Sequence, residues 1–278
     1  MRVGIQGVKA SFHDLAARKY FLDNQNLKLV EHLSFPDLLD ALEKKELDYA
    51  VMAVENAIAG SILSNYGLME NHDFRIVGEV FVKIEMALLG HVDSEIENLK
   101  VIKSHPMALL QCQKYLRSLK GVQLVESDDT AQSAKEIAES NDKSTGAVAS
   151  VLAGQEYGIK VLKRNIETDS ANFTRFLVLC RKENFKKNEY ANKSSIRFEV
   201  KHDPGSLAKV LSILDAYEIN MTKIHSLPII GRPYHYAFHV DLEWSCYDDY
   251  VNAIKWLEGR ALNFSSYGEY KSGEKVLL

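Results

Sequence analysis

Short apolar segments alternate with amphipathic ones over the first 180 residues, and this alternation constrains the fold more than any other feature. The strand-like segments are 2–5, 27–31, 49–54, 101–103, 122–125, 146–149 and 173–179. The helix-like segments between them are 14–22, 37–45, 107–117 and 130–139. Such a pattern predicts an α/β fold with largely parallel sheets that are covered by helices on both faces.

Two long segments suggest that this α/β region has two lobes. Residues 75–89 form an almost unbroken extended run, which can carry the chain from one lobe to the other. We expect the return crossing near 162–173. A cleft between two lobes follows as a hypothesis.

The composition changes at residues 181–193, where five basic residues, two glutamates and three asparagines replace the apolar pattern. A solvated linker is the simplest interpretation. Beyond it, the segments 195–201, 207–217, 221–227, 234–242, 247–257 and 264–270 read as strand, helix, strand, strand, helix, strand. That order is the ferredoxin-like βαββαβ motif. The predicted domains are therefore 1–181 (lobe one about 1–77 and 163–181, lobe two about 78–162), a linker at 182–193, and 194–278.

Charge and cysteine content narrow the class of partner. The chain has 34 Lys and Arg against 38 Asp and Glu, a formal net charge of −4, so it lacks the basic excess typical of nucleic-acid binding. Cys112, Cys180 and Cys246 are widely separated, which disfavours a disulfide framework or a zinc site. No signal peptide or bilayer-length apolar run occurs. We expect a cytoplasmic protein with a small-molecule substrate and no membrane partner.

Several familiar catalytic patterns can be set aside. The sequence contains no GxGxxG, no GxxxxGK[ST] and no GxSxG. His235 and His239 would lie roughly 13 Å apart on a strand, too far for one metal ion. Ser11, His13 and Asp14 are too close in sequence to place a base between two partners, as a hydrolytic triad requires.

Three segments remain as candidates for chemistry. Val54–Ser61 follows a buried strand and supplies a carboxylate, two amide or hydroxyl side chains and a glycine at the sheet edge where α/β folds bind ligands. In Ser104–Gln111, Ser104 can cap a helix. In Asn172–Phe176, strand geometry projects Asn172, Thr174 and Phe176 to one face and Arg175 to the other. Each also has a structural interpretation: helix cap, strand former or salt-bridge partner.

Taken together, these segments resemble those of prephenate dehydratases, in the same order and at similar separations. Gly4–His13 resembles the opening glycine and Ser-Phe segment of that family, Val54–Ala57 its Glu-Asn-Ser loop, Ser104–Gln111 its Ser-His-Pro motif, and Thr174–Phe176 its Thr-Arg-Phe signature. The second domain resembles the ACT regulatory module. Its matching segments are Asp203–Leu207 and Asn220–Ile224.

The resemblance implies a two-lobed, periplasmic-binding-protein-like catalytic domain followed by an ACT domain. It implies conversion of prephenate to phenylpyruvate, water and carbon dioxide in L-phenylalanine biosynthesis, with no cofactor, no metal and no covalent nucleophile. L-Phenylalanine would be the effector, and the ACT domains would join a homodimer or a dimer of dimers. The implied catalytic residues are Thr174, Ser104, Asn56 and Gln111; the substrate-binding residues Arg175, Phe176, Glu55, Ser11 and His105; and the effector-binding residues Gly205, Ser206, Leu207, Asn220 and Met221. Thr174 is the predicted donor to the leaving hydroxyl.

Departures from the family pattern leave alternatives open. Ala57 replaces a Ser or Thr, and Met107 replaces a Gln, so two polar contacts in the cleft are lost or supplied elsewhere. His225 and Leu227 stand where many members have Glu and Arg, which alters the charge at the effector site. Arogenate dehydratase is one alternative, and a noncatalytic sensor of aromatic amino acids is another. The residues alone do not choose between prephenate and arogenate.

Overall fold

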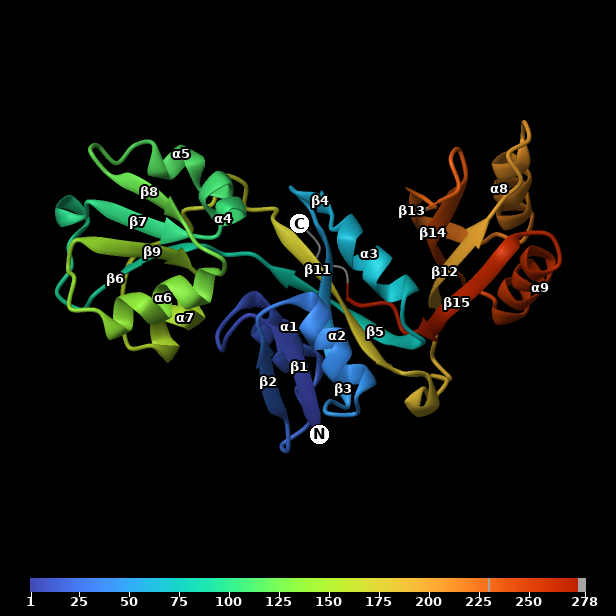
Figure 1. The fold of residues 1–278 in the computed structure, drawn as a ribbon, viewed down its shortest axis with the longest axis horizontal. Helices are drawn as coiled ribbons and strands as arrows, with labels where there is room; N and C mark the ends of the chain where they lie inside the picture. Colours follow the sequence, from blue (N-terminus) through green and yellow to red (C-terminus); the bar gives the residue numbers. More distant parts are fainter. Residues whose placement is uncertain (230, 275–278) are drawn as a thin grey trace. The chain divides into compact units, whose positions relative to one another are not determined.

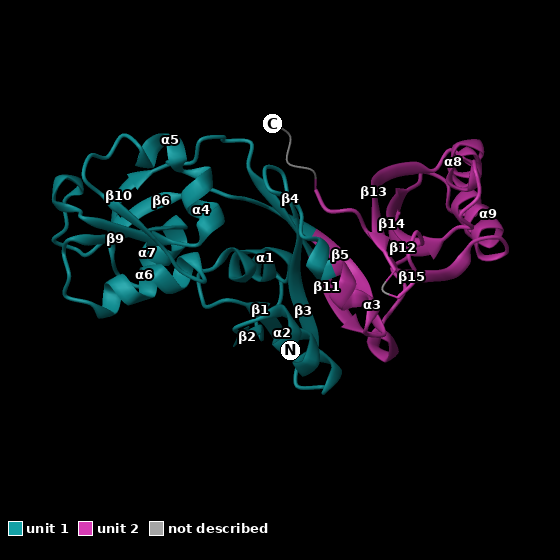
Figure 2. Ribbon diagram, turned by 45° about the horizontal axis from the view of Figure 1, so that its top comes forward, with its two compact units in different colours: residues 1–65, 80–176, 275–278 teal, residues 66–79, 177–274 magenta. Residues whose placement is uncertain are grey.

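The computed structural model describes residues 1–229 and 231–274. The chain forms two compact units, shown in different colours in Figure 2: residues 1–65 with 80–176, and residues 66–79 with 177–274. The division passes through two strands, β5 (Phe74–Lys83) and β11 (Phe173–Arg181). The limits at 181 and 194 stay predictions.

The first lobe is built on a sheet with the strand order β2-β1-β3-β11-β5, and a short strand β4 pairs with β3. Strand β1 pairs in parallel with both β2 and β3. The other elements of this lobe are β1 (Arg2–Gln6), α1 (Phe12–Tyr20), β2 (Lys28–His32), α2 (Phe35–Glu43), β3 (Tyr49–Asn56), β4 (Gly60–Ser61) and α3 (Leu63–Glu70). Helix α3 runs into the second unit and was not predicted, because its sequence has no regular apolar period.

The second lobe, green in Figure 1, has the strand order β10-β6-β9-β7-β8. Its elements are β6 (Ala87–Gly90), η1 (Ile96–Asn98), β7 (Val101–Ser104), α4 (Pro106–Gln111), α5 (Gln113–Leu116), β8 (Gln123–Glu126), α6 (Thr130–Glu139), β9 (Thr145–Ala149), α7 (Val151–Glu156) and β10 (Lys160–Arg164). Strand β7 is parallel to β8 and β9, whereas β6 is antiparallel to β9 and β10. The sheet is therefore mixed, and the prediction of largely parallel sheets is wrong here. Strands β6 and β10 lie on the crossing segments, where no βαβ crossover imposes a parallel direction.

Local chemistry explains where the helices of the first unit begin and end. Ser34 caps α2 by accepting a hydrogen bond from the Asp37 amide at 3.2 Å, with Pro36 in the first turn, as the sequence indicates. The predicted helix 107–117 is instead broken at Cys112 into α4 and α5. The break coincides with a hydrogen bond from the Thr168 amide to the Gln111 carbonyl at 2.8 Å, which ties this turn to another segment.

The two α/β lobes bury apolar cores under their helices. Leu38, Leu39 and Leu42 of α2 are fully buried against the first sheet. Gly4 of β1 is required at this contact, since an added Cβ would lie 2.4 Å from methyl groups of Leu38 and Leu47. In the second lobe, Ala131, Ala134 and Ile137 of α6 pack with β6 and β9 in one core cluster.

The second unit contains the predicted βαββαβ order. Its elements are η2 (Lys182–Asn184), β12 (Lys193–Glu199), α8 (Ser206–Ala216), β13 (Asn220–Pro228), β14 (Tyr236–Glu243), α9 (Tyr247–Glu258) and β15 (Leu262–Tyr270). The antiparallel strand order is β13-β14-β12-β15, and the fold is ferredoxin-like. Phe198, Leu242 and Leu257 are fully buried in the core between the sheet and the two helices, which lie on one side of it in Figure 1.

Buried charges distinguish this sheet from an ordinary apolar one. Lys193 Nζ lies 3.0 Å from Glu79 Oε1, and both side chains are almost fully buried. His239 Nε2 lies 2.6 Å from Glu70 Oε1, while His235 Nδ1 bonds the Pro233 carbonyl. Each histidine of the spaced pair thus has a hydrogen-bond partner of its own.

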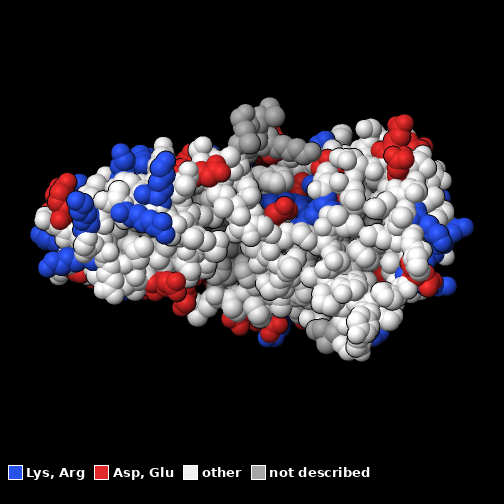
Figure 3. Space-filling view, turned by 90° about the horizontal axis from the view of Figure 1, so that it is seen from above, with Lys and Arg blue, Asp and Glu red and all other residues white. Residues whose placement is uncertain are grey.

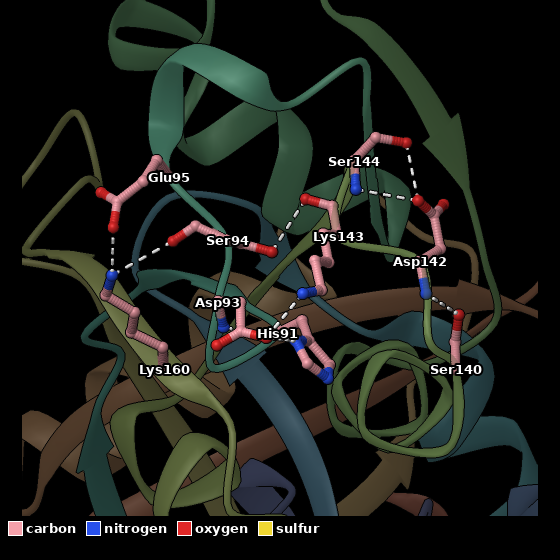
Figure 4. A network of polar contacts seen from close by, with 9 residues as sticks. All are labelled: His91, Asp93, Ser94, Glu95, Ser140, Asp142, Lys143, Ser144 and Lys160. Carbon is pink, nitrogen blue, oxygen red and sulfur yellow. Dashed lines mark hydrogen bonds and ion pairs between the residues drawn. The ribbon is translucent and has the colours of Figure 1, made fainter.

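A solvated polar network occupies residues 91–95, 140–144 and Lys160, which we call the far end of the second lobe (Figure 4). Lys143 Nζ contacts Asp93 at 2.6 Å, Lys160 Nζ contacts Glu95 at 2.7 Å, and Asp142 accepts hydrogen bonds from Ser144. On the face drawn in Figure 3, both basic and acidic side chains are exposed at the left end, and the basic ones cover more of it. Among the helices in the described ranges, none is both long and apolar enough to cross a bilayer.

Candidate active site

Asn56, at the carboxyl end of β3, is the centre of a buried polar network. Its side-chain nitrogen donates to Asn172 Oδ1 at 2.7 Å and to Thr174 Oγ1 at 2.9 Å. Its side-chain oxygen accepts hydrogen bonds from the backbone amides of Ile58 and Ala59. The loop after β3 therefore fixes the Asn56 amide, and the amide in turn positions the start of β11.

The second lobe contributes Gln111, the last residue of α4, to the same network. Gln111 Nε2 donates to Asn56 Oδ1 at 3.3 Å, and its Oε1 accepts from Asn172 Nδ2 at 3.0 Å. Three amides and one hydroxyl are thus joined, and each residue is at most 9% exposed. Since buried polar groups are costly unless paired, this closed set of bonds holds a fixed geometry.

Thr174 stands at the edge of this network and faces a pocket. Because Thr174 Oγ1 accepts a hydrogen bond from Asn56, the hydrogen of its hydroxyl can be donated to another acceptor. The pocket has a volume of about 460 Å³ and is lined by residues of both lobes, among them Thr174, Phe176, Ser11 and His105. The strand geometry predicted from the sequence is observed, since Thr174 and Phe176 line the pocket and Arg175 does not.

Two predicted pocket residues begin helices. Ser11 is buried and caps α1 by accepting from the Asp14 amide at 3.3 Å. His105, not Ser104 as predicted, is the N-cap of α4, where its Nδ1 accepts from the Met107 amide at 3.2 Å. The Ser104 hydroxyl instead donates to the Val148 carbonyl at 2.6 Å and is fully buried. The structure therefore ties Ser104 to β9 and does not bring it into the Asn56 network.

Arg175 and Glu55 form a pair away from the pocket lining. Arg175 Nη1 lies 3.8 Å from Glu55 Oε2; the arginine side chain is 5% exposed and the glutamate 41%. This is the salt-bridge arrangement that the sequence left open for Arg175. Ala57 stands where the family has a Ser or Thr. Its backbone amide donates to the Phe173 carbonyl at 2.8 Å, and this contact does not involve the side chain.

Three further residues at the site were not predicted as site residues. Asn172 completes the amide network, His13 lines the pocket, and Asp129 at the start of α6 lines it from the second lobe. His13 Nε2 accepts from the Ala53 amide at 3.4 Å, its ring packs edge-on against Phe176, and burial lowers its pKa to about 3. The Asp14 carboxylate bonds Arg18 and the Ala10 amide, so the described contacts do not arrange Ser11, His13 and Asp14 as a relay. The signal for Asn172 was its period-2 relation to Thr174; Asp129 gave no comparable signal.

Comparisons with known proteins identify the family of this chain. The family model described as prephenate dehydratase matches residues 3–184. The chain belongs to the prephenate dehydratase family. The arogenate dehydratase/prephenate dehydratase 2 of Arabidopsis thaliana is 36% identical over 97% of this chain and 72% of its own length.

Solved structures share the fold of this chain. The quorum-quenching acylase GqqA has a TM-score of 0.87 with 28% identity, covering 98% of both chains. The prephenate dehydratase of Arthrobacter aurescens, solved with L-Phe, has a TM-score of 0.87 with 22% identity, covering 98% of this chain and 90% of that one. The latter likeness shows the shared fold, including the ferredoxin-like part. The curated relatives are named as arogenate dehydratases, prephenate dehydratases or both, which places the chain among the dehydratases of aromatic amino-acid biosynthesis.

The predicted effector residues fall into two groups. Gly205, Ser206 and Leu207 line a pocket of about 340 Å³ at the start of α8, together with side chains such as Tyr234 and Phe238. Asn220 and Met221 lie at the start of β13, where they pair with the end of β14, and they do not line that pocket. Gly205 has a φ of +76°, a conformation that favours glycine at this turn.

Proposed function

We propose that this chain catalyses the decarboxylating dehydration of prephenate to phenylpyruvate, with Thr174 as the hydrogen-bond donor to the leaving hydroxyl. The observation that carries this proposal is the bond from Asn56 Nδ2 to Thr174 Oγ1 at 2.9 Å. It occupies an acceptor site of the threonine and polarises the hydroxyl, which strengthens its donation toward the pocket. The hydrogen bonds that Asn56 and Gln111 make in this network support their predicted catalytic roles.

The reaction needs a donor where charge develops. As the bond between the ring and its carboxylate breaks, the electron pair enters the ring, carbon dioxide leaves, and the bond to the opposite hydroxyl breaks. Hydrogen bonding from Thr174 stabilises the departing oxygen, and a proton from solvent completes the water molecule. A threonine hydroxyl is a weak acid, so donation within a fixed network is its natural contribution. No step calls for a metal, cofactor or covalent intermediate.

The decisive experiment offers the purified protein prephenate and L-arogenate in separate reactions. Phenylpyruvate formation from prephenate, followed by its absorbance in base, is the expected result. A protein that binds prephenate but converts neither compound would support the noncatalytic sensor instead, and a protein that converts only L-arogenate would also overturn the proposal.

L-Arogenate is the second candidate substrate, and one observation favours it. The pocket that contains Thr174 is lined by two carboxylates, Asp128 and Asp129, and its lining within the described ranges includes no Lys or Arg. Prephenate carries two negative charges, whereas arogenate carries the same two carboxylates with an ammonium group. Acidic walls repel the first more than the second. Phenylalanine formation in the arogenate reaction would identify this activity.

We also propose that the C-terminal βαββαβ part is an ACT domain that binds L-phenylalanine and joins subunits into a homodimer or a dimer of dimers. Support comes from the pocket at Gly205–Leu207 and from the structural relative that was solved with L-Phe. Calorimetry should show saturable L-phenylalanine binding together with reduced turnover, by preferential binding to a less active state. No binding heat and unchanged turnover at saturating L-phenylalanine would reject this regulation, and sedimentation would test the assembly.

A further inference from the structure

Asp129 occupies a distinctive position in the pocket. It is the N-cap of α6 in the second lobe, and its Oδ1 accepts a hydrogen bond from the Gln132 amide at 2.8 Å. The carboxylate is partly buried, and burial raises its pKa. Its backbone carbonyl accepts from Ser133 Oγ at 3.0 Å, so side chain and backbone are both held in place.

The other carboxylate oxygen faces the first lobe. At Gly7, just after β1, an added Cβ would lie 2.8 Å from Asp129 Oδ2 and 3.5 Å from Ser11 Cβ. Gly7 also has a φ of +89°, so this loop is shaped in a way that favours glycine and admits the carboxylate. Asp129 therefore lies where the loops of both lobes meet, beside the predicted substrate-binding residue Ser11.

The charge of the pocket makes this position consequential. Asp129 lines the pocket together with Asp128, Thr174 and His105. The other described lining residues are neutral or apolar, and none is Lys or Arg. The keto group of a keto acid has only acceptor atoms, and the Asp129 carboxylate repels them. An α-ammonium group offers donors and the opposite charge, and a charge-assisted hydrogen bond is stronger than a neutral one.

We infer that Asp129 is a specificity-determining residue that receives the α-ammonium group of an aminated substrate, and that it shifts this enzyme toward arogenate relative to prephenate. The inference rests on the proposed function, since it concerns the same pocket. Discrimination between arogenate and prephenate is assigned to the Asp129 side chain, and Thr174 remains the donor to the leaving hydroxyl. Asp128 is exposed, whereas Asp129 is half-buried, so we expect Asp128 to contribute less.

The test is Asp129→Asn, because Asn caps a helix as well as Asp does and removes only the charge. We expect the ratio of kcat/KM for arogenate to kcat/KM for prephenate to fall at least tenfold. Asp128→Asn is the matched control and should change that ratio less than threefold. Far-UV circular dichroism and thermal unfolding check that both variants fold.

Three outcomes would overturn the inference: an unchanged ratio, an equal loss for both substrates, or an equal change in the Asp128→Asn control. Calorimetric affinities in a Thr174→Ala background separate this test from the proposed function. If the wild-type protein turns over neither compound, the proposed function fails. A preference for binding arogenate that disappears with Asp129→Asn would still support the inference in that case, and its persistence would overturn it.

Discussion

Two polar networks in the first unit contrast in chemistry and setting. The network around Asn56 consists of amides and a hydroxyl, carries no net charge and is at most 9% exposed. The network at the far end of the second lobe consists mainly of ions, and the side chains of its Lys143–Asp93 pair are 57% and 59% exposed (Figure 4).

This contrast indicates which polar contacts fix the positions of the side chains that make them. Neutral amides can be buried at modest cost when every group is paired, and loss of one member leaves the others unsatisfied. Exposed ions remain solvated, so each pair contributes little. We expect substitutions in the Asn56 network to alter activity and stability strongly, and substitutions in the solvated network to have small effects.

The largest expected effect is the loss of turnover in Thr174→Ala. Removing the proposed donor should lower kcat by roughly 10²- to 10⁴-fold, the range typical of a positioned proton donor. Thr174→Ser, which keeps the hydroxyl, is the matched control and should retain far more activity. Steady-state kinetics with both substrates makes the measurement. Near-normal turnover in the alanine variant would eliminate the donor role.

Next in size is the stability loss of Asn56→Ala. The substitution removes donors from Asn172 and Thr174 and an acceptor from Gln111, so we expect the free energy of unfolding to fall by about 2–4 kcal/mol. Urea titration measures this difference. Asn24→Ala, at an exposed turn, should cost under about 0.5 kcal/mol. Equal losses in the two variants would contradict the strong effect expected for the buried Asn56 network.

An intermediate effect concerns the pH dependence of stability at His13. Burial lowers the His13 pKa from 6.5 to about 3, so between these values the unfolded chain binds a proton that the folded chain does not. The contribution of His13 to stability is therefore present above pH 6.5 and is lost as the pH falls toward 3. Thermal unfolding across this interval should show a shallower decline for His13→Gln. Parallel curves for wild type and variant would refute this.

The smallest effect is expected in the solvated network. Hydrogen bonds from Thr145 and Ser144 lower the Asp142 pKa from 3.8 to about 2. Its contribution is thus present above pH 4 and is lost as the pH falls toward 2. Asp142→Asn removes this small contribution, so it should slightly lower stability at pH 7 and slightly reduce the slope of acid unfolding in that window. A large loss at pH 7 would show that exposed ions matter more here than we infer.

Much of the fold could be predicted because it depends on local patterns. The strand at Phe173–Arg181, the start of α2 at Ser34 and the βαββαβ order all follow from apolar period, capping residues and turn residues. Helix α3 was missed because its apolar residues have no regular period. The mixed sheet of the second lobe was missed because strand direction depends on which segments cross between lobes, and no residue type encodes that.

The sequence by itself determined the family, the two kinds of α/β architecture and the candidates Asn56, Gln111 and Thr174. Only the tertiary structure decided how they are used. It joined three amides from distant segments to Thr174, tied Ser104 to Val148, paired Arg175 with Glu55, and brought Asp129 against Gly7. The physical reason is that capping and periodicity act within a few residues, whereas hydrogen-bond partners and pocket charge depend on contacts between distant residues such as Asn56 and Thr174, which are 118 positions apart.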